Sequence, residues 1–107
     1  MEAEIFNELY GRIVRSFMDI VILAELRKSA PMSGYDIIAF INKKFHLLLS
    51  SGTVYNVLYA LERKGFVEGI WSRRKRMYKP TDKGEETINI ILNAYAKIEN
   101  FVATLCK

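Results

Sequence analysis

Residues on which enzyme and metal chemistry depend are scarce in this 107-residue sequence. Cysteine and histidine each occur once, as Cys106 and His46, so no internal disulfide can form and few groups remain for nucleophilic catalysis or metal binding. No paired carboxylates, nucleophile with a base or phosphate-binding loop can be recognised. We therefore expect no enzymatic activity, no metal and no cofactor. The single cysteine is typical of a reducing compartment, and we expect a cytoplasmic protein.

Long hydrophobic runs are also missing. The longest purely apolar stretches, residues 20–24 and 37–41, are far shorter than the about 20 residues of a membrane helix. Acidic residues near the N-terminus replace the basic region of a secretory signal. Two prolines and six glycines leave little room for linkers. The sequence therefore predicts one domain over residues 1–107, with no membrane span and no secretory signal.

Positive charge is concentrated in one short segment. The formal net charge is +4, and residues 63–79 hold seven basic residues against one acid, whereas the segments on either side are slightly acidic. Such a cluster attracts a polyanion, although a basic run can also be a solvated loop. The structural context of the segment decides between these interpretations.

Apolar residues at three- and four-residue steps predict a first helix over residues 4–28, in which Gly11 is the weakest point. Pro31 ends this helix, because the residue before a proline resists helical geometry. Ser33 and Asp36 have the spacing of a capping box, which predicts that a second helix begins there.

The second helix is expected to end near Phe45. Ser50 or Ser51 then caps a third helix, which Gly65 ends as a left-handed residue. A last helix is predicted over residues 81–105, with acidic residues in its first turn.

Two short strands are predicted between the third and last helices. Residues 66–71 and 77–80 have strand character, and the basic residues 72–76 between them predict a hairpin with a basic tip. Trp71, at the base of this hairpin, is expected to pack rather than to face a ligand. Three helices, a hairpin and a closing helix, in this order, indicate a mainly α winged helix-turn-helix fold.

The predicted parts of this fold are an N-terminal helix (1–28), a helix-turn-helix with its wing (33–80) and a C-terminal dimerisation helix (81–106). In winged helices the third helix enters the major groove of DNA and the wing lies along the backbone. Asparagine can pair with adenine and arginine with guanine, whereas wing cations and a helix N-terminus suit phosphates. The expected DNA-binding residues are Ser50, Ser51, Thr53, Tyr55, Asn56, Tyr59, Arg63, Arg73, Arg74, Lys75 and Arg76.

Tyr55 lies at the edge of the outward face, so a position at the core edge and a DNA contact are both open for it. The last helix would span about 36 Å, which is more than a winged-helix core needs. Its apolar stripe, together with that of the first helix, therefore predicts a homodimer, with packing inside one domain as the alternative. The expected dimerisation residues are Phe6, Leu9, Ile13, Phe17, Ile88, Ile91, Tyr95, Ile98, Val102 and Leu105.

An ordered set of short motifs runs from the second helix to the start of the last. The motifs are SGYDI at residues 33–37, SGTVY at 51–55 with Leu58, LE at 61–62, GFV at 65–67 and RMYKPTDKG at 76–84. Together they resemble the PadR-type transcriptional regulators, over roughly residues 15–106. The sequence departs from the pattern of that family at Ser33, Ser51 and Pro80, where histidine, proline and leucine are frequent.

The resemblance implies a homodimeric DNA-binding repressor of the shorter branch, which has one C-terminal dimerisation helix. It implies that the third helix and the wing bind DNA, and some members of the family respond to small aromatic or hydrophobic effectors. A winged-helix protein-interaction module and a non-specific DNA-binding protein are the alternatives.

Overall fold

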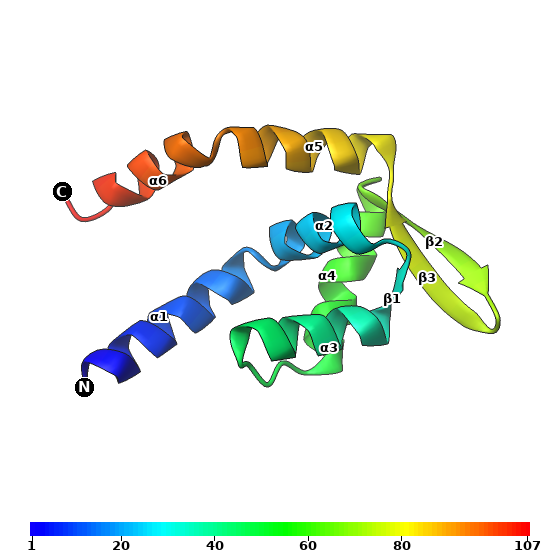
Figure 1. Ribbon diagram of the computed structural model, residues 1–107, viewed down its shortest axis with the longest axis horizontal. Helices are drawn as coiled ribbons and strands as arrows, with labels where there is room; N and C mark the ends of the chain where they lie inside the picture. Colours follow the sequence, from blue (N-terminus) through cyan, green and yellow to red (C-terminus); the bar gives the residue numbers. More distant parts are fainter.

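The computed structural model describes residues 1–107 as six helices and three short strands. These elements are α1 (Glu2–Ser16), α2 (Met18–Ser29), β1 (Met32–Ser33), α3 (Gly34–Phe45), α4 (Ser51–Arg63), β2 (Val67–Ser72), β3 (Lys75–Pro80), α5 (Asp82–Asn93) and α6 (Tyr95–Thr104). The β2–β3 hairpin, which is the wing, projects from one end of the molecule, and α1 and α6 extend from the other (Figure 1). The expected mainly α winged helix-turn-helix is confirmed.

Side-chain caps begin the helices of the helix-turn-helix. The Ser33 hydroxyl accepts the Asp36 amide at 3.1 Å, and the Asp36 carboxylate accepts the Ser33 amide at 3.1 Å, which confirms the capping box. Ser50 rather than Ser51 caps α4, because its hydroxyl accepts the amide of Thr53 at 3.2 Å. Thr81 caps α5 in the same way, and the loop glycine Gly65 has the expected positive φ of 82°.

Both long helices expected from the sequence are interrupted. The segment 4–28 divides at Phe17, and not at Gly11, which lies buried inside α1. The segment 81–105 divides at Ala94, where φ is −99° and ψ is 16°. At the first interruption the burial changes sharply, since Met18 is fully buried while Phe17 before it is 40 % exposed. Neither position holds a proline or a glycine.

The sheet contains one strand that the sequence did not predict. Its order is β1-β3-β2, and β1 is a two-residue strand that pairs with the central strand through Met32 and Tyr78. The hairpin is also longer than expected, because Lys75 pairs with Ser72 inside the ladder. The turn thus contains only two residues, Arg73 and Arg74, and Lys75 and Arg76 belong to β3 rather than to the turn.

One hydrophobic core joins α2, α3, α4, the sheet and α5. Its fully buried side chains are Met18, Ile22, Leu26, Ile37, Ile41, Val54, Leu58, Val67, Tyr78 and Ile88. Ile88 has no exposed surface and Ile91 packs against the same core, so the assignment of Ile88 to a dimer interface was wrong. The backbone of α5 brings Ile88 inward because Thr81 anchors the start of this helix against the loop before β2, through a 2.6 Å hydrogen bond to the Gly65 carbonyl.

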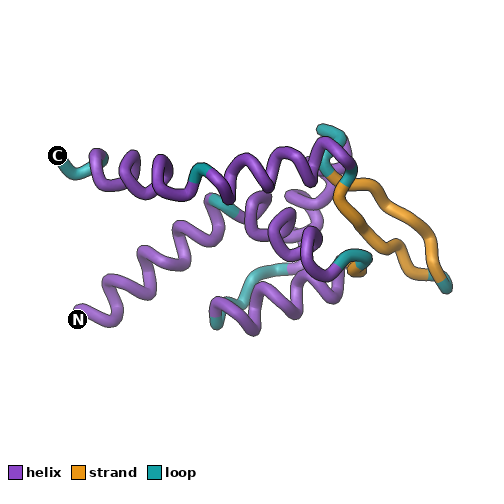
Figure 2. The backbone as a smooth tube through the Cα atoms, turned by 45° about the horizontal axis from the view of Figure 1, so that its top comes forward, coloured by secondary structure: helices purple, strands orange, loops and turns teal.

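The tube view shows how far α1 and α6 stand apart from this core (Figure 2). No residue of α6 is buried, and in α1 only Gly11 and Val14 are. None of the six helices has both the length and the apolar composition that a membrane crossing requires.

Gly84 is expected to be essential for packing α5 onto the sheet. A Cβ at this position would overlap the carbonyl oxygen of Phe66, which accepts the amide of Thr81 at 3.0 Å. Replacing Gly84 with alanine should lower the free energy of unfolding by about 1–3 kcal/mol. The measurement is urea unfolding followed by circular dichroism at one protein concentration.

Gly52 provides the matched control, because no atom lies within 4 Å of a Cβ built there. Gly52→Ala should leave the free energy of unfolding unchanged or raise it by up to about 1 kcal/mol. Equal stability of Gly84→Ala and the unsubstituted protein would contradict the proposed packing.

Candidate nucleic-acid interface

The first turn of α4 presents polar groups to solvent. Ser50, Ser51 and Thr53 are all exposed, and the hydroxyls of Ser50 and Thr53 lie 2.8 Å apart in the cap. The backbone N–H groups at the start of a helix have no partner within it, so this end favours an anion such as a phosphate. The three residues that the sequence predicted for this role thus lie together at one end of α4.

Two tyrosines of α4 differ in exposure. Tyr59 is 43 % exposed, whereas the ring of Tyr55 is half-buried and packs against α3, where it occupies the space that a side chain on Gly34 would need. The two rings lie 5.7 Å apart between centroids and are tilted by 35°. Tyr55 therefore lies at the core edge, where it also lines one cleft with Tyr59, and its contact with DNA stays a prediction.

Asn56 and Arg63 are also exposed on α4. Asn56 does not share a cleft with Tyr59, however. It lines a separate cleft of about 350 Å³ beside the junction of α1 and α2, together with Asp19 and Lys64. The predicted residues of α4 therefore lie along an exposed ridge with a cleft on either side.

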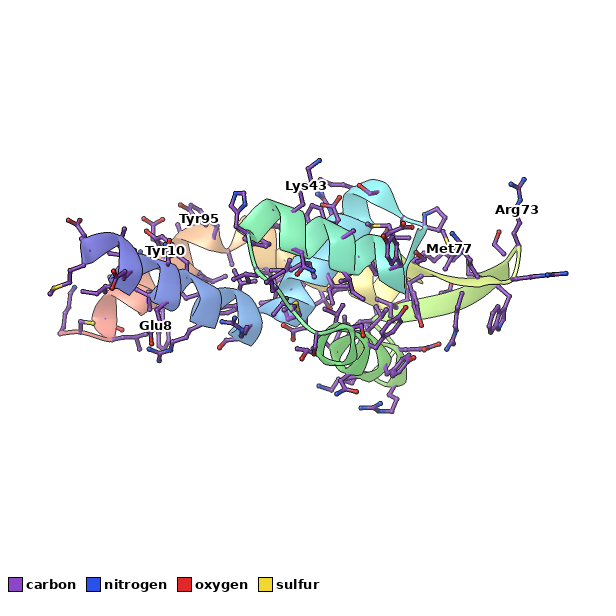
Figure 3. All side chains as sticks on the ribbon, turned by 90° about the horizontal axis from the view of Figure 1, so that it is seen from below. Glu8, Tyr10, Lys43, Arg73, Met77 and Tyr95 are labelled. Carbon is purple, nitrogen blue, oxygen red and sulfur yellow. The ribbon has the colours of Figure 1, made fainter.

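The tip of the wing carries cations that no acid neutralises. Arg73, Arg74 and Lys75 are exposed, and none of them takes part in an ion pair. Figure 3 shows the Arg73 side chain at the far end of the hairpin, directed away from it. Such exposed, unpaired cations suit phosphates, which are recognised by charge.

The turn holds these cations in an unfavourable backbone conformation. Arg73 and Arg74 have φ values of 50° and 69°, so both central residues of the two-residue turn are left-handed. Asparagine and glycine are preferred in such a turn, because other side chains crowd the backbone there. The sequence thus places two arginines where local stability favours other residues, which is typical of functional positions.

Arg76 differs from the three cations at the tip. It lies in β3, its guanidinium pairs with the Glu62 carboxylate on α4, and it covers the Tyr78 ring at 5.5 Å. Burial raises the pKa of the Tyr78 phenol, and the charge of Arg76 partly offsets this. The charge of Arg76 is thus paired with Glu62 inside the subunit, unlike that of the three cations before it, and its contact with a phosphate stays a prediction.

A cleft of about 580 Å³ separates α4 from the wing and contains residues that the sequence analysis did not select. Tyr35, in the first turn of α3, is 75 % exposed, and Trp71 is 73 % exposed. The expected packing of Trp71 is therefore wrong. Trp71 shares a face of β2 with buried Val67, but it lies near the turn of the hairpin, beyond the core, where it lines the cleft beside Lys75. Tyr35 could have been found from its place two residues after the Ser33 cap, which brings it beside Tyr55 and Tyr59 of α4.

Most residues of the expected dimer interface remain on the surface of the subunit. Ile91 is half-buried, and Ile88 is interior. The residues with exposed side chains are Phe6, Leu9, Ile13 and Phe17 on or next to α1, and Tyr95, Ile98, Val102 and Leu105 on or next to α6. Both helices run to the same end of the molecule, opposite the wing (Figures 1 and 2).

No group of three or more His, Cys, Asp or Glu side chains could hold a metal ion. The chemistry of this surface is therefore that of cations, hydroxyls, amides and aromatic rings. It can bind an extended polyanion and contact the edges of its bases.

The family model and the solved structures that match this chain carry the same family name. The model of the transcriptional regulator PadR-like family matches residues 22–90, which is more than half of the chain. No curated protein matches the sequence. Residues 76–84 and the helix-turn-helix motifs that carried the resemblance lie inside the matched range.

Solved structures share the fold. A PadR-like transcriptional regulator from Bacillus cereus has a TM-score of 0.75 at 20% identity, covering 90% of this chain and 97% of its own. A PadR family transcriptional regulator from Eggerthella lenta has a TM-score of 0.78 at 18% identity, covering 99% and 96%. Bacillus subtilis PadR, solved in complex with operator DNA, has a TM-score of 0.59 at 28% identity, covering 70% and 47%.

The strained turn at the tip of the wing predicts a gain in stability when its arginines are replaced. Changing Arg73-Arg74 to Asn-Gly should raise the free energy of unfolding by about 1 kcal/mol, because both new residues tolerate positive φ. Thermal unfolding followed by circular dichroism measures the change. The matched control is Ala-Ala, which removes the same two charges and keeps the strain. If the Asn-Gly and Ala-Ala variants unfold at the same temperature, the turn is not strained.

Proposed function

The chain belongs to the PadR-like family of transcriptional regulators, and on this basis we propose that it is a homodimeric repressor that binds a specific sequence of double-stranded DNA. One observation supports this above all others. The unpaired cations Arg73, Arg74 and Lys75 stand at the tip of a wing beside the exposed ridge of α4. The wing thus provides charge for the phosphates, and α4 beside it provides side chains for the edges of the bases.

In the proposed complex, α4 is the recognition helix and enters the major groove. Asn56 and Arg63 contact base edges, since an amide can pair with adenine and a guanidinium with guanine. Tyr59 contacts the groove wall or a thymine methyl group. The wing tip and the N-terminus of α4 contact phosphates on either side. Bacillus subtilis PadR was solved with operator DNA, which supports the same kind of ligand for this chain.

We propose that α1 and α6 form the homodimer interface. The ten-residue helix α6 has no buried residue, and an isolated helix shorter than about 12–15 residues is marginal in water. Its apolar side chains, together with those of α1, would be covered by the same surfaces of a second copy. A symmetric dimer reads two half-sites about one helical turn of DNA apart, or a multiple of that.

Membership of the family supports two further proposals, one on the location of the protein in the cell and one on a small-molecule effector. A regulator that acts on promoters is expected in the cytoplasm of its cell. A small aromatic or hydrophobic effector, where one exists, has a candidate site in a cavity of about 640 Å³ between α1 and the end of α3, lined in part by Tyr10, Val14, Phe45 and Leu47.

Selection of bound duplexes from a random library, at near-physiological salt, tests the proposed function. An enriched palindrome is expected. Binding without enrichment would indicate a non-specific DNA-binding protein. An absence of binding would favour a module that recognises an acidic protein partner through the wing.

Variants of the wing and of α4 should affect DNA binding differently. Arg73→Ala/Arg74→Ala should weaken binding to all duplexes alike and reduce the slope of log affinity against log salt by about 2. Asn56→Ala or Arg63→Ala should cost about 1–3 kcal/mol on the selected duplex and change the preferred sequence. Fluorescence titrations of selected and scrambled duplexes at several salt concentrations measure both effects.

Lys43→Ala on α3 is the control for removing a cation far from the wing tip (Figure 3). It should bind as the unsubstituted protein does. If the four substitutions at the interface leave affinity, salt slope and preference unchanged, the DNA-binding surface has been assigned to the wrong face.

Dimerisation should fail when a charge is placed on the apolar face of α6. Ile98→Asp should give a monomer at micromolar concentration in sedimentation, because a buried carboxylate in the interface has no partner. Leu48→Asp, on the loop before α4, places the same charge at a side chain that is 97 % exposed and should remain dimeric. A monomeric unsubstituted protein at that concentration would exclude the proposed dimer.

A further inference from the structure

The wing is joined to α4 by one arginine. The guanidinium of Arg76, on β3, forms an ion pair with the carboxylate of Glu62, on α4. Of the three ion pairs in the structure, this is the only one between the wing and a helix, since Lys79–Glu68 lies within the wing and Lys28–Glu25 lies within α2. The two elements that carry the proposed DNA-binding residues are therefore held together at this pair.

Packing fixes the position of the guanidinium as well. It covers the ring of Tyr78 at 5.5 Å and lies over Gly69 on the neighbouring strand. A Cβ on Gly69 would come within 2.8 Å of the Arg76 Cζ, so glycine at this position leaves the space that the guanidinium fills. The Tyr78 ring and the absence of a side chain on Gly69 together form a site that fits the planar guanidinium group of Arg76.

The Arg76 side chain contains a buried polar atom whose environment argues against a free side chain. Its Nε atom is buried and has no hydrogen-bond partner, although unsatisfied buried N–H groups are unfavourable. A wing arginine that served phosphates could extend into solvent and avoid this cost, as the three unpaired cations near the tip do. Arg76 instead stays folded back between the strands and α4.

We propose that Arg76 is a positioning residue, which with Glu62, Gly69 and Tyr78 fixes the angle between the wing and α4. This rests on the proposed function, because the benefit of a fixed angle is that the wing tip and α4 reach one duplex together. A rigid arrangement avoids the entropy lost when a free wing is ordered on binding. The Arg76–Glu62 pair thus raises DNA affinity without touching DNA.

Replacement of Glu62 separates this proposal from a direct phosphate contact by the sign of the effect. Removal of a carboxylate near DNA should raise affinity if Arg76 is thereby freed to bind a phosphate. If Arg76 positions the wing, Glu62→Gln should instead lower affinity for the selected duplex, by about tenfold. Arg76→Lys should lower affinity similarly, because it keeps the charge and loses the planar fork.

Glu68→Gln is the matched control. It also removes one carboxylate charge, but from an ion pair within the wing, which has a length of 3.2 Å and two side chains that are about half exposed. Its affinity should be unchanged or slightly raised, since exposed pairs contribute little to stability.

A second measurement needs no DNA. Trp71, on the wing, is the only tryptophan of the chain, so its time-resolved fluorescence anisotropy reports the mobility of the wing. Glu62→Gln and Arg76→Lys should both add a fast decay that Glu68→Gln lacks, with far-ultraviolet circular dichroism unchanged. Gly69→Ala should add it too, because it displaces the guanidinium and leaves both charges in place. This variant serves if Glu62→Gln does not fold.

The proposal requires both a lower DNA affinity and a faster decay of the Trp71 anisotropy in these variants. Unchanged or tighter DNA binding by Glu62→Gln would overturn it, as would an unchanged Trp71 anisotropy in the folded variants. If the unsubstituted protein binds no duplex, the proposed function fails, whereas the anisotropy still shows whether the pair fixes the wing.

Discussion

The burial of Tyr78 in the central strand connects the parts of this protein. Tyr78 pairs with Met32 of β1 on one side and with Gly69 of β2 on the other, and it is 2 % exposed. Because β1 leads directly into α3, the same residue ties the helix-turn-helix to the wing. The ring also supports the Arg76 guanidinium on the same face of β3, so one side chain connects the core to the Arg76–Glu62 ion pair.

The arrangement separates two tasks at opposite ends of the molecule. The wing and the α4 ridge carry exposed cations and polar groups, while α1 and α6 carry exposed apolar groups (Figure 1). In the proposed dimer, a change in how two copies pack at the apolar end would alter the spacing of the two wings. The elements from α2 to α5 lie between these ends and share one core, so such a change would move them together.

Local patterns in the sequence predicted most of the fold. The caps at Ser33, Ser50 and Thr81 and the left-handed Gly65 were readable because each depends on residues within three or four positions. The strand β1 was not, since two residues carry no periodicity and its pairing is with a distant segment. The break at Phe17 was missed because no proline or glycine marks it and the apolar periodicity continues through it.

The candidate site was predictable to a similar degree. The cations of the tip and the polar face of α4 follow from charge and helical periodicity. The partner of Arg76 could not be read from the sequence, because Glu62 is brought to it by the packing of β3 against α4. Ile88 was assigned to the wrong surface because a heptad pattern identifies an apolar stripe without saying which surface covers each part of it.

The order of strands in the sheet has a consequence for how the chain folds. The central strand, β3, is the last of the three in sequence, and it must be present before β1 or β2 has a neighbour. As the chain leaves the ribosome, α2, α3 and α4 are therefore complete while their shared core still lacks Tyr78 and Ile88. Pairing of such distant segments is slow and leaves apolar surface uncovered for that time. A nascent chain of this protein that stops before residue 75 therefore exposes apolar surface of its core, even though every helix of its DNA-binding motif has already been synthesised.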